Sequence, residues 1–343
     1  IIHLGLEDTA VIDRNKSFGE HGGDSLGAVN FSLMVEDVFG IIFPADKILD
    51  PTGNINSWAK DIETLKSSDG NRAGFASIHG AGARIVESKD LTLEAFLSPD
   101  VLAQAASLPE APATPETVLL TGATGFLGRH VCLEWLSALP ETGRLICLVR
   151  ANDDAGAKAR LDAVFNESMP EMRDTFKRLG QGRIEVMAAD ISMPDLGVSR
   201  GKFDDLSGRV DRICHVGALV NHRLSYEHLF SPNVAGTAEI IKLALSQTRK
   251  PIDFVSTVSV LPLLDREDDN KETAMPAAKL LLSDAYASGY ATSKWAAEIL
   301  LRNAHEACSM PVNILRGNMM LAHRDLPGAI NPSDMFTRLL FSV

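Results

Sequence analysis

Three side chains in the second half of the chain have the types and spacing of a proton-transfer site. Tyr290 and Lys294 are four residues apart, so both lie on one face if the segment is a helix. A tyrosine hydroxyl, with an ordinary pKa of about 10, donates a proton near neutrality only if its phenolate is stabilised, which a nearby lysine favours. Thr257 ends an apolar segment, and its hydroxyl can hold a carbonyl oxygen that becomes negative. Tyr286 is eight residues from Lys294, so Tyr290 is the better candidate.

These side chains need a scaffold, and the chain from residue 117 onward has the pattern of one. Apolar segments of strand length alternate with helical segments, which is typical of a parallel α/β sheet. Asn233 begins one helix, and Tyr290 opens a long one that runs to about His305. The expected strands are Thr117–Leu120, Leu145–Val149, Ile184–Ala189, Arg212–Val216, Asp253–Thr257 and Val312–Leu315.

The turn after the first of these strands is rich in glycine. Gly122, Gly125 and Gly128 have the spacing G-x-x-G-x-x-G, and a helical pattern follows over Arg129–Ala138. Glycines let the backbone approach a pyrophosphate, and the helix N-terminus offers free N–H groups to it. Strand, glycine turn and helix therefore predict a dinucleotide site, although a tight turn alone would also use such glycines. The motif resembles that of the short-chain dehydrogenase/reductase superfamily.

Two arginines indicate which dinucleotide is bound. Arg150 ends the second strand, where an enzyme specific for NAD usually has an acid that binds the ribose hydroxyl. An arginine there suits a 2′-phosphate, and Arg160 follows on the next predicted helix. The alternative is a solvated arginine at a strand end. Asp190 and Ile191 follow the third strand, where they can face an adenine.

A second motif lies near the start of the chain. Ser25 stands in the sequence Gly-Gly-Asp-Ser-Leu, just before an amphipathic pattern that extends to Phe39. Asp24 or Ser25 can cap this helix. The motif also resembles the attachment site of acyl and peptidyl carrier proteins, in which the serine carries a 4′-phosphopantetheine arm. A serine at a helix N-terminus is suited to that modification, because the nearby amides favour the negative charge of a phosphodiester.

The segment between the two motifs is expected to be a connection. Residues 67–71 have a flexible composition, and residues 108–117 are rich in Pro, Ala and Glu, as in a semi-stiff linker. Residues 90–97 are too apolar for a free tether. We expect them to pack on one of the domains.

Composition limits the possible classes of protein. A length of 343 residues favours two domains, and a formal charge of −12 argues against nucleic acid or an anionic membrane as partner. No apolar run is long enough to span a bilayer. The four cysteines lack metal-ligand spacing, so we expect no metal and a reducing, cytoplasmic location. The first residue is Ile, from which we expect a piece of a longer chain, and we interpret His215 and His222 as structural.

Taken together, the motifs resemble the bacterial carboxylic acid reductases over essentially the whole chain. The resemblance implies a Rossmann-type parallel sheet, of the extended short-chain dehydrogenase/reductase kind, preceded by a small all-α four-helix carrier domain. It implies a carrier over residues 1–68, a linker over 69–115 and an incomplete reductase domain over 116–343. The motifs that carry it are Gly22–Leu26, Ser77–Gly80, Asp90–Leu93, the glycine turn, Ala218–His222, Asn233–Thr237, Ser256–Thr257 and Gly289–Ala296.

The resemblance also implies a reaction. A phosphopantetheinyl transferase modifies Ser25, and an upstream adenylation domain loads a carboxylic acid on the arm as an acyl thioester. NADPH then reduces the thioester, and the hemithioacetal collapses to an aldehyde and a free thiol. Tyr290 would donate the proton, Lys294 would orient it and the nicotinamide ribose, and Thr257 would polarise the carbonyl. The residues implied to hold NADP(H) are Gly122, Thr124, Gly125, Phe126, Leu127, Arg150, Arg160, Asp190, Ile191, Ala218, Leu219, Val220, Ser256, Tyr290 and Lys294.

The chain departs from the family pattern in two respects, and other functions remain open. The family's reductase domain continues beyond Val343, and the position of Asn318 is often acidic in relatives, where it is tied to stopping at the aldehyde. One alternative is the terminal reductase of a peptide synthetase or aminoadipate reductase. Another is an extended short-chain epimerase, which has no reason to carry the Ser25 motif. The third is a carrier with a nucleotide-binding docking domain that performs no chemistry.

Overall fold

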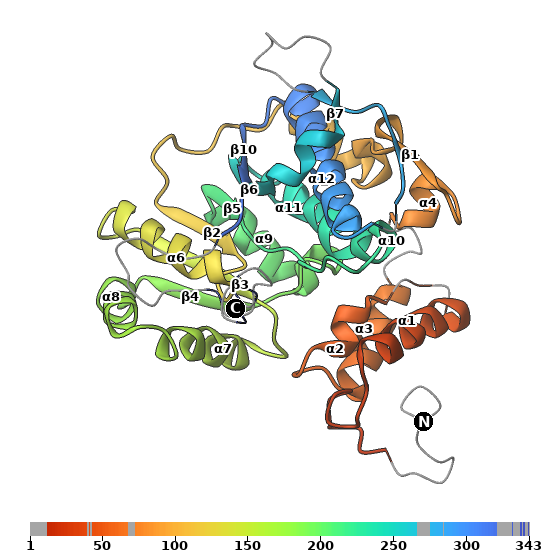
Figure 1. Ribbon diagram of the computed structural model, residues 1–343. Coiled ribbons are helices and arrows are strands. Elements are labelled where there is room, and N and C mark those ends of the chain that lie inside the picture. Colours follow the sequence, from red (N-terminus) through yellow and green to blue (C-terminus); the bar gives the residue numbers. More distant parts are fainter. Residues whose placement is uncertain are drawn as a thin grey trace.

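The computed structural model describes residues 12–39, 41, 43–67, 73–265, 275–283 and 285–320, together with 331, 337, 339 and 342. Figure 1 shows a small helical unit beside a larger α/β unit. None of the helices in these ranges is long and apolar enough to cross a membrane.

The small unit contains α1 (Ser25–Phe39), α2 (Ala45–Leu49) and α3 (Ile55–Ser67). Helix α1 begins as the sequence predicts, because the Asp24 side chain accepts a hydrogen bond from the Gly27 amide at 2.7 Å. The core is a cluster of buried side chains that includes Phe18, Phe43 and Trp58. Three of the four expected helices are thus described, and a fourth would have to involve residues outside the described ranges.

The large unit is built on a six-stranded sheet in which all strands are parallel. Its strands are β2 (Thr117–Thr121), β3 (Arg144–Val149), β4 (Ile184–Ala188), β5 (Arg212–His215), β6 (Ile252–Thr257) and β10 (Val312–Gly317). Their spatial order is β10-β6-β5-β2-β3-β4, so the order of connection reverses between β2 and β5. In such sheets the ligand binds at the carboxyl ends of the strands at this switch point. The predicted fold class is confirmed.

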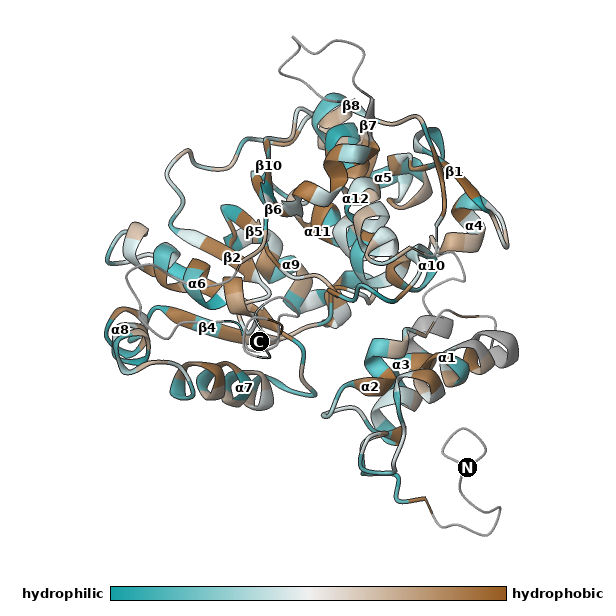
Figure 2. Cartoon of the chain, in the orientation of Figure 1, coloured by the Kyte–Doolittle hydropathy of each residue, from teal (hydrophilic) through white to brown (hydrophobic). Residues whose placement is uncertain are grey.

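Alternating side chains of the sheet pack against two layers of helices. In β2, Leu119 belongs to one buried cluster and Val118 and Leu120 to the other. The first cluster includes α9 (Arg200–Arg209), α11 (Gly236–Ala244) and α12 (Ser288–Cys308). The second includes α6 (Phe126–Ala138), α7 (Asp154–Asn166) and α8 (Pro170–Gly180). In Figure 2, β2 and β4 are hydrophobic over most of their length, whereas the helices carry both hydrophobic and hydrophilic residues.

The segment that precedes the sheet packs on the large unit. It contains α4 (Phe75–His79), β1 (Ile85–Glu87), two 3-10 turns (Ser88–Asp90 and Leu93–Ala95) and α5 (Pro99–Ala105). Leu91, Leu93 and Leu97 are buried in the same cluster as α12. Strand β1 pairs with β9 (Lys279–Leu281), which is distant in the sequence. The prediction that residues 90–97 pack on a domain is therefore confirmed.

The remaining elements lie in the connections of the large unit. The sequence predicts a helix that begins at Asn233, but α11 begins at Gly236, and Phe230–Ala235 form a π-helical turn after α10 (Tyr226–Leu229). Such turns are rare and frequently lie at functional sites. The other elements are the 3-10 turns Pro194–Gly197 and Val258–Leu263 and the short strands β7 (Leu264–Asp265) and β8 (Met275–Pro276).

Candidate active site and cofactor pocket

The glycine turn lies at the switch point and brings two backbones into close contact. Gly122 has a φ of 77°, and a Cβ there would meet the amide nitrogen of Gly217, two residues after β5, at 2.7 Å. A Cβ at Gly128 would overlap the backbone oxygen of Gly122. Glycine is needed at both positions, because the first requires a left-handed backbone and the second a close approach of helix and turn. This cradle fits a pyrophosphate at the N-terminus of α6.

A polar side chain fixes the two strand ends against each other. The Thr121 hydroxyl accepts from the Gly217 amide at 2.9 Å and lies 2.8 Å from Nδ1 of His215. Burial, and then the charge of Lys294, lowers the pKa of His215 to about 3, so the imidazole is neutral at physiological pH. His215 is 1% exposed, which agrees with the structural role predicted for it.

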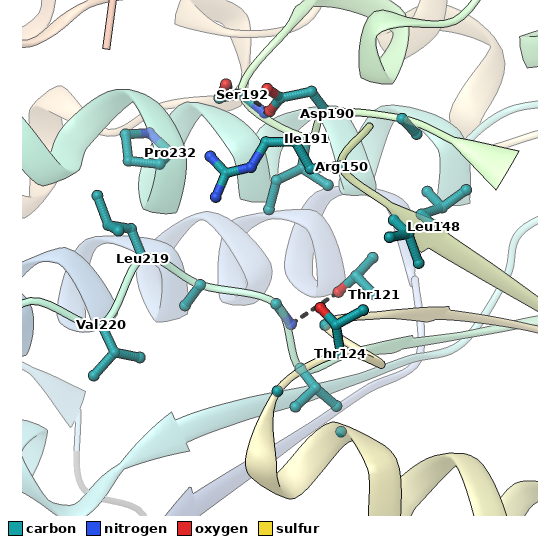
Figure 3. Close-up of a pocket in the computed structure, with 18 of the residues that line it drawn as sticks. Thr121, Thr124, Leu148, Arg150, Asp190, Ile191, Ser192, Leu219, Val220 and Pro232 are labelled. Carbon is teal, nitrogen blue, oxygen red and sulfur yellow. Dashed lines mark hydrogen bonds between the residues drawn. The ribbon is translucent and has the colours of Figure 1, made fainter. Parts of the chain in front are cut away.

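The turn borders a pocket of about 330 Å³. Figure 3 shows Arg150 and Asp190 on one side of this pocket, Thr121 and Thr124 on the opposite side, and Leu219 and Val220 on a third. The predicted cofactor residues that line it are Gly122, Thr124, Gly125, Leu127, Arg150, Arg160, Asp190, Ile191, Ala218, Leu219 and Val220. Phe126, Ser256, Tyr290 and Lys294 are outside this lining. The pocket also has lining residues that the sequence motifs do not predict, among them Leu148, Ser192, Pro232 and, from α2 of the small unit, Asp46.

Asp190 is a partly buried acid that lines this pocket. The Ser192 hydroxyl donates to its carboxylate at 2.6 Å. Burial alone would raise the pKa of Asp190, but Lys47, Arg150 and Ser192 outweigh it and lower the pKa to about 2. The carboxylate is therefore ionised and can accept hydrogen bonds from a ligand.

Helix α12 carries the predicted proton-transfer pair. Tyr290 and Lys294 lie one turn apart in its first half. The Lys294 ammonium donates to the backbone oxygen of Val255 at 2.8 Å and lies 4.4 Å from the centre of the Phe254 ring. Burial raises the pKa of Tyr290 to about 12. This direction is opposite to the predicted stabilisation of the phenolate, and Tyr290 remains protonated at neutral pH.

The end of β6 is tied to α12 and β10 by a buried carboxylate. Glu298 is fully buried, accepts from the Ser256 hydroxyl at 2.6 Å and pairs with Arg316 at 2.7 Å. The hydroxyl of Ser256, which was predicted to hold the cofactor, thus donates its hydrogen bond to Glu298 in this structure. Thr257 follows it, and its hydroxyl lies 3.3 Å from that of Ser259. This anchor fixes the strand end that carries Thr257 relative to the helix that carries Tyr290.

Two further residues approach the site without having been predicted to act there. The His222 ring packs edge-on against Tyr290, with ring centres 5.5 Å apart. Asn233, in the π-helical turn, binds both the amide and the oxygen of Leu219 and also the Ser293 hydroxyl at 3.0 Å. It thereby links the pocket wall to α12. Both positions lie in sequence motifs of the predicted family, but spacing alone did not reveal these contacts.

The predicted attachment residue lies on the surface. Ser25 is exposed at the first position of α1, and the next residue, Leu26, is 69% exposed. A hydroxyl in this position is accessible to a modifying enzyme. All four cysteines are buried and free, and the described residues contain no group of side chains suited to a metal ion.

Comparison with known proteins agrees with both halves of this description. The family model described as "Male sterility protein" matches residues 120–343, and that of the phosphopantetheine attachment site matches residues 4–62. A carboxylic acid reductase of Segniliparus rugosus is 43% identical to this chain, and the match covers 97% of the chain. A carboxylic acid reductase of Mycobacterium tuberculosis is 44% identical, and the match covers 95% of the chain. The chain spans 28% of the length of each of these relatives.

A solved structure shows the same similarity. The reductase domain of a nonribosomal peptide synthetase from Mycobacterium tuberculosis is 42% identical, with a TM-score of 0.68. The match covers 75% of this chain and 60% of that one.

The fold and the pocket define an NAD(P)-binding reductase domain of the extended short-chain dehydrogenase/reductase class, preceded by a helical carrier with a phosphopantetheine attachment site. The chain belongs to the family of the male sterility protein and is a carboxylic-acid-reductase-like chain.

Proposed function

We propose that this chain reduces an acyl thioester, held on its own carrier, to an aldehyde with NADPH. The observation that carries the proposal is the joint presence of an exposed Ser25 at a carrier helix and of Tyr290 and Lys294 on α12, the helix that Asn233 links to the wall of the predicted cofactor pocket. We also propose that residues 1–68 form the carrier, that residues 69–115 connect it, and that residues 116–343 belong to the reductase domain.

The residues fit the two groups that this chemistry needs. Gly122, Gly125 and the N-terminus of α6 would hold the pyrophosphate of NADP(H), and Arg150 with Arg160 would bind the 2′-phosphate. When bound, the nicotinamide supplies a hydride, and the thiol of 4′-phosphopantetheine on Ser25 carries the acyl group.

The catalytic roles follow from the chemistry of the side chains. Tyr290 holds its proton at neutral pH and donates it from the hydroxyl to the reacting carbonyl oxygen. The Thr257 hydroxyl donates a hydrogen bond to the same oxygen. Lys294, released from Val255, would bind the nicotinamide ribose and orient the tyrosine. An upstream adenylation domain and a phosphopantetheinyl transferase are the proposed partners, and a carboxylic acid is the source of the acyl group.

A peptidyl thioester is the second candidate substrate, since a reductase domain of a peptide synthetase is 42% identical. The two differ in the acyl group that arrives on the carrier. The relatives described above give no support to the epimerase alternative.

The test uses a phosphopantetheinyl transferase and a set of acyl- and aminoacyl-coenzyme A donors to load the full-length polypeptide. Mass spectrometry should show one arm, on Ser25, and NADPH should convert the acyl group to an equal amount of aldehyde. The Ser25→Ala variant should gain no arm and give no aldehyde. An arm on another serine, or loaded protein that consumes no NADPH, would refute the proposal.

A further inference from the structure

The carrier contacts the rim of the cofactor pocket through α2. The Asp46 carboxylate pairs with the Arg150 guanidinium at 2.6 Å. The Asp50 carboxylate lies 3.0 Å from Nε of Arg150 and 3.5 Å from Arg160. The two arginines proposed for the 2′-phosphate are therefore both engaged by carboxylates of the carrier.

A second set of contacts holds the same face of the carrier. Lys47, which is 6% exposed, pairs with Asp190 of the pocket at 3.1 Å. The Asn152 side chain donates to the backbone oxygen of Thr52 at 3.1 Å. Met193 of the reductase is 3% exposed and belongs to the hydrophobic cluster of the carrier. Charge complementarity and apolar packing thus coincide on this face.

One of these carboxylates lies in the candidate cofactor pocket. Asp46 is one of the side chains that line the 330 Å³ pocket, and Figure 3 shows the Arg150 side chain directed into it. Guanidinium groups bind carboxylates and phosphates with the same planar set of N–H donors. Two aspartates around one arginine therefore present the kind of negative charge that a phosphate dianion would present.

One oxygen of the Asp46 carboxylate, Oδ1, has lost its contact with water and gains no hydrogen bond among the described residues in return. Burial raises the pKa of Asp46, Arg150 opposes this rise, and the nearby Asp190 adds to it. An ionised Asp46 therefore carries a desolvation cost in this position, which suits a reversible contact more than a permanent one.

We propose that α2 of the carrier docks on the 2′-phosphate subsite of the reductase, so that this docked arrangement and bound NADPH exclude each other. The inference rests on the proposed function for the assignment of Arg150 and Arg160. In the absence of cofactor the carrier is held on the pocket rim. When NADPH enters, its 2′-phosphate takes the arginines from Asp46 and Asp50, and the carrier is released to present its arm.

The first experiment measures cofactor affinity by fluorescence titration. The Asp46→Asn/Asp50→Asn variant should bind NADPH about tenfold more tightly if the carrier is docked about nine-tenths of the time, because apparent affinity scales with the free fraction. The control Glu63→Gln, an exposed acid of α3, should leave the affinity unchanged. An unchanged affinity in the double variant would overturn the proposal.

The second experiment detects the carrier directly. A Thr52→Cys/Asn152→Cys pair spans the contact, and the four natural cysteines are buried. A short thiol-to-thiol crosslinker should join the pair without cofactor, and saturating NADPH should slow the reaction at least tenfold. An Asn15→Cys/Asn56→Cys pair lies inside the carrier, where the two side chains are 3.0 Å apart, and should react at one rate in both conditions.

The outcomes separate the two claims. Crosslinking at the same rate with and without saturating NADPH would show that carrier and cofactor coexist, which refutes the docking proposal alone. If Arg150→Ala leaves the ratio of NADPH to NADH affinity unchanged, the assignment of the 2′-phosphate fails instead, whatever the crosslinking shows.

Discussion

The ammonium of Lys294 lies 2.8 Å from the backbone oxygen of Val255. The contact ties the first half of α12 to the end of β6, and the charge also lies over the Phe254 ring. Burial lowers the pKa of Lys294 to about 7, with Glu298 opposing the shift. A lysine that is costly to bury and is held by a single carbonyl is suited to exchange that partner for a ribose hydroxyl.

The burial of Lys294 predicts a stability change that depends on pH. Its pKa falls from 10.5 to about 7 on folding, so the unfolded state binds more protons between these values. The penalty is complete below about pH 7 and is relieved as pH rises toward 10.5. Lys294→Met should therefore stabilise the protein most near pH 6 to 7, and the gain should shrink toward pH 10 in thermal unfolding. The exposed Lys158→Met is the control, and a gain that does not vary with pH would contradict the pKa assignment.

The Glu298 anchor predicts a large loss of stability. Glu298→Ala leaves Arg316 and Ser256 without their shared partner, and removing one member of a buried ion pair costs about 3–5 kcal/mol. We expect the lower end, since the Arg316 side chain is 22% exposed. Urea unfolding measures the effect, and the exposed Glu306→Ala on the same helix should change stability by less than about 0.5 kcal/mol. An unfolding midpoint for Glu298→Ala equal to that of the control would show that Glu298 does not anchor β6 and β10 to α12.

The arginines at the pocket rim predict cofactor selectivity. A charge-assisted contact is worth about 1.5–3 kcal/mol, which corresponds to about tenfold to more than a hundredfold in affinity. NADPH should bind more tightly than NADH by this factor, and Arg150→Ala should reduce the ratio toward one. Titration of both cofactors against both proteins measures it. Equal affinities of the two cofactors for the Asp46→Asn/Asp50→Asn variant, in which the carrier leaves the arginines free, would contradict the assignment of Arg150.

The sheet and the glycine turn were predictable because their signals are local. Each strand is a short apolar run, and the positions of Gly122 and Gly128 follow from a turn that the next ten residues complete. Residues 90–97 were predicted to pack on a domain because a free tether would expose the apolar side chains of Leu91 and Leu93 to water. In each case the neighbours in sequence are sufficient to show the physical reason.

The contacts that position the site were not predictable in this way. Asn233 meets Ser293 across 60 residues, and Arg150 meets Asp46 across 104. No periodicity connects such pairs, because they depend on how the carrier and two layers of helices come together. The same holds for the pKa of Tyr290. The four-residue spacing predicts a lysine that favours the phenolate, whereas burial in the folded chain raises the pKa of Tyr290 to about 12.

The proposed mechanism is tested most directly by the single-turnover oxidation of NADPH by the full-length polypeptide, with an acyl thioester preloaded on Ser25. Tyr290→Phe removes only the hydroxyl, so the rate should fall by about 10²–10⁴ while NADPH affinity changes little. Lys294→Ala should impair both, and the two defects should not multiply in the double variant, because residues that act as a unit are non-additive. If Tyr290→Phe reduces the thioester at the wild-type rate, Tyr290 is not the proton donor. If the loaded wild type oxidises no NADPH, the chain is a carrier with a nucleotide-binding docking domain.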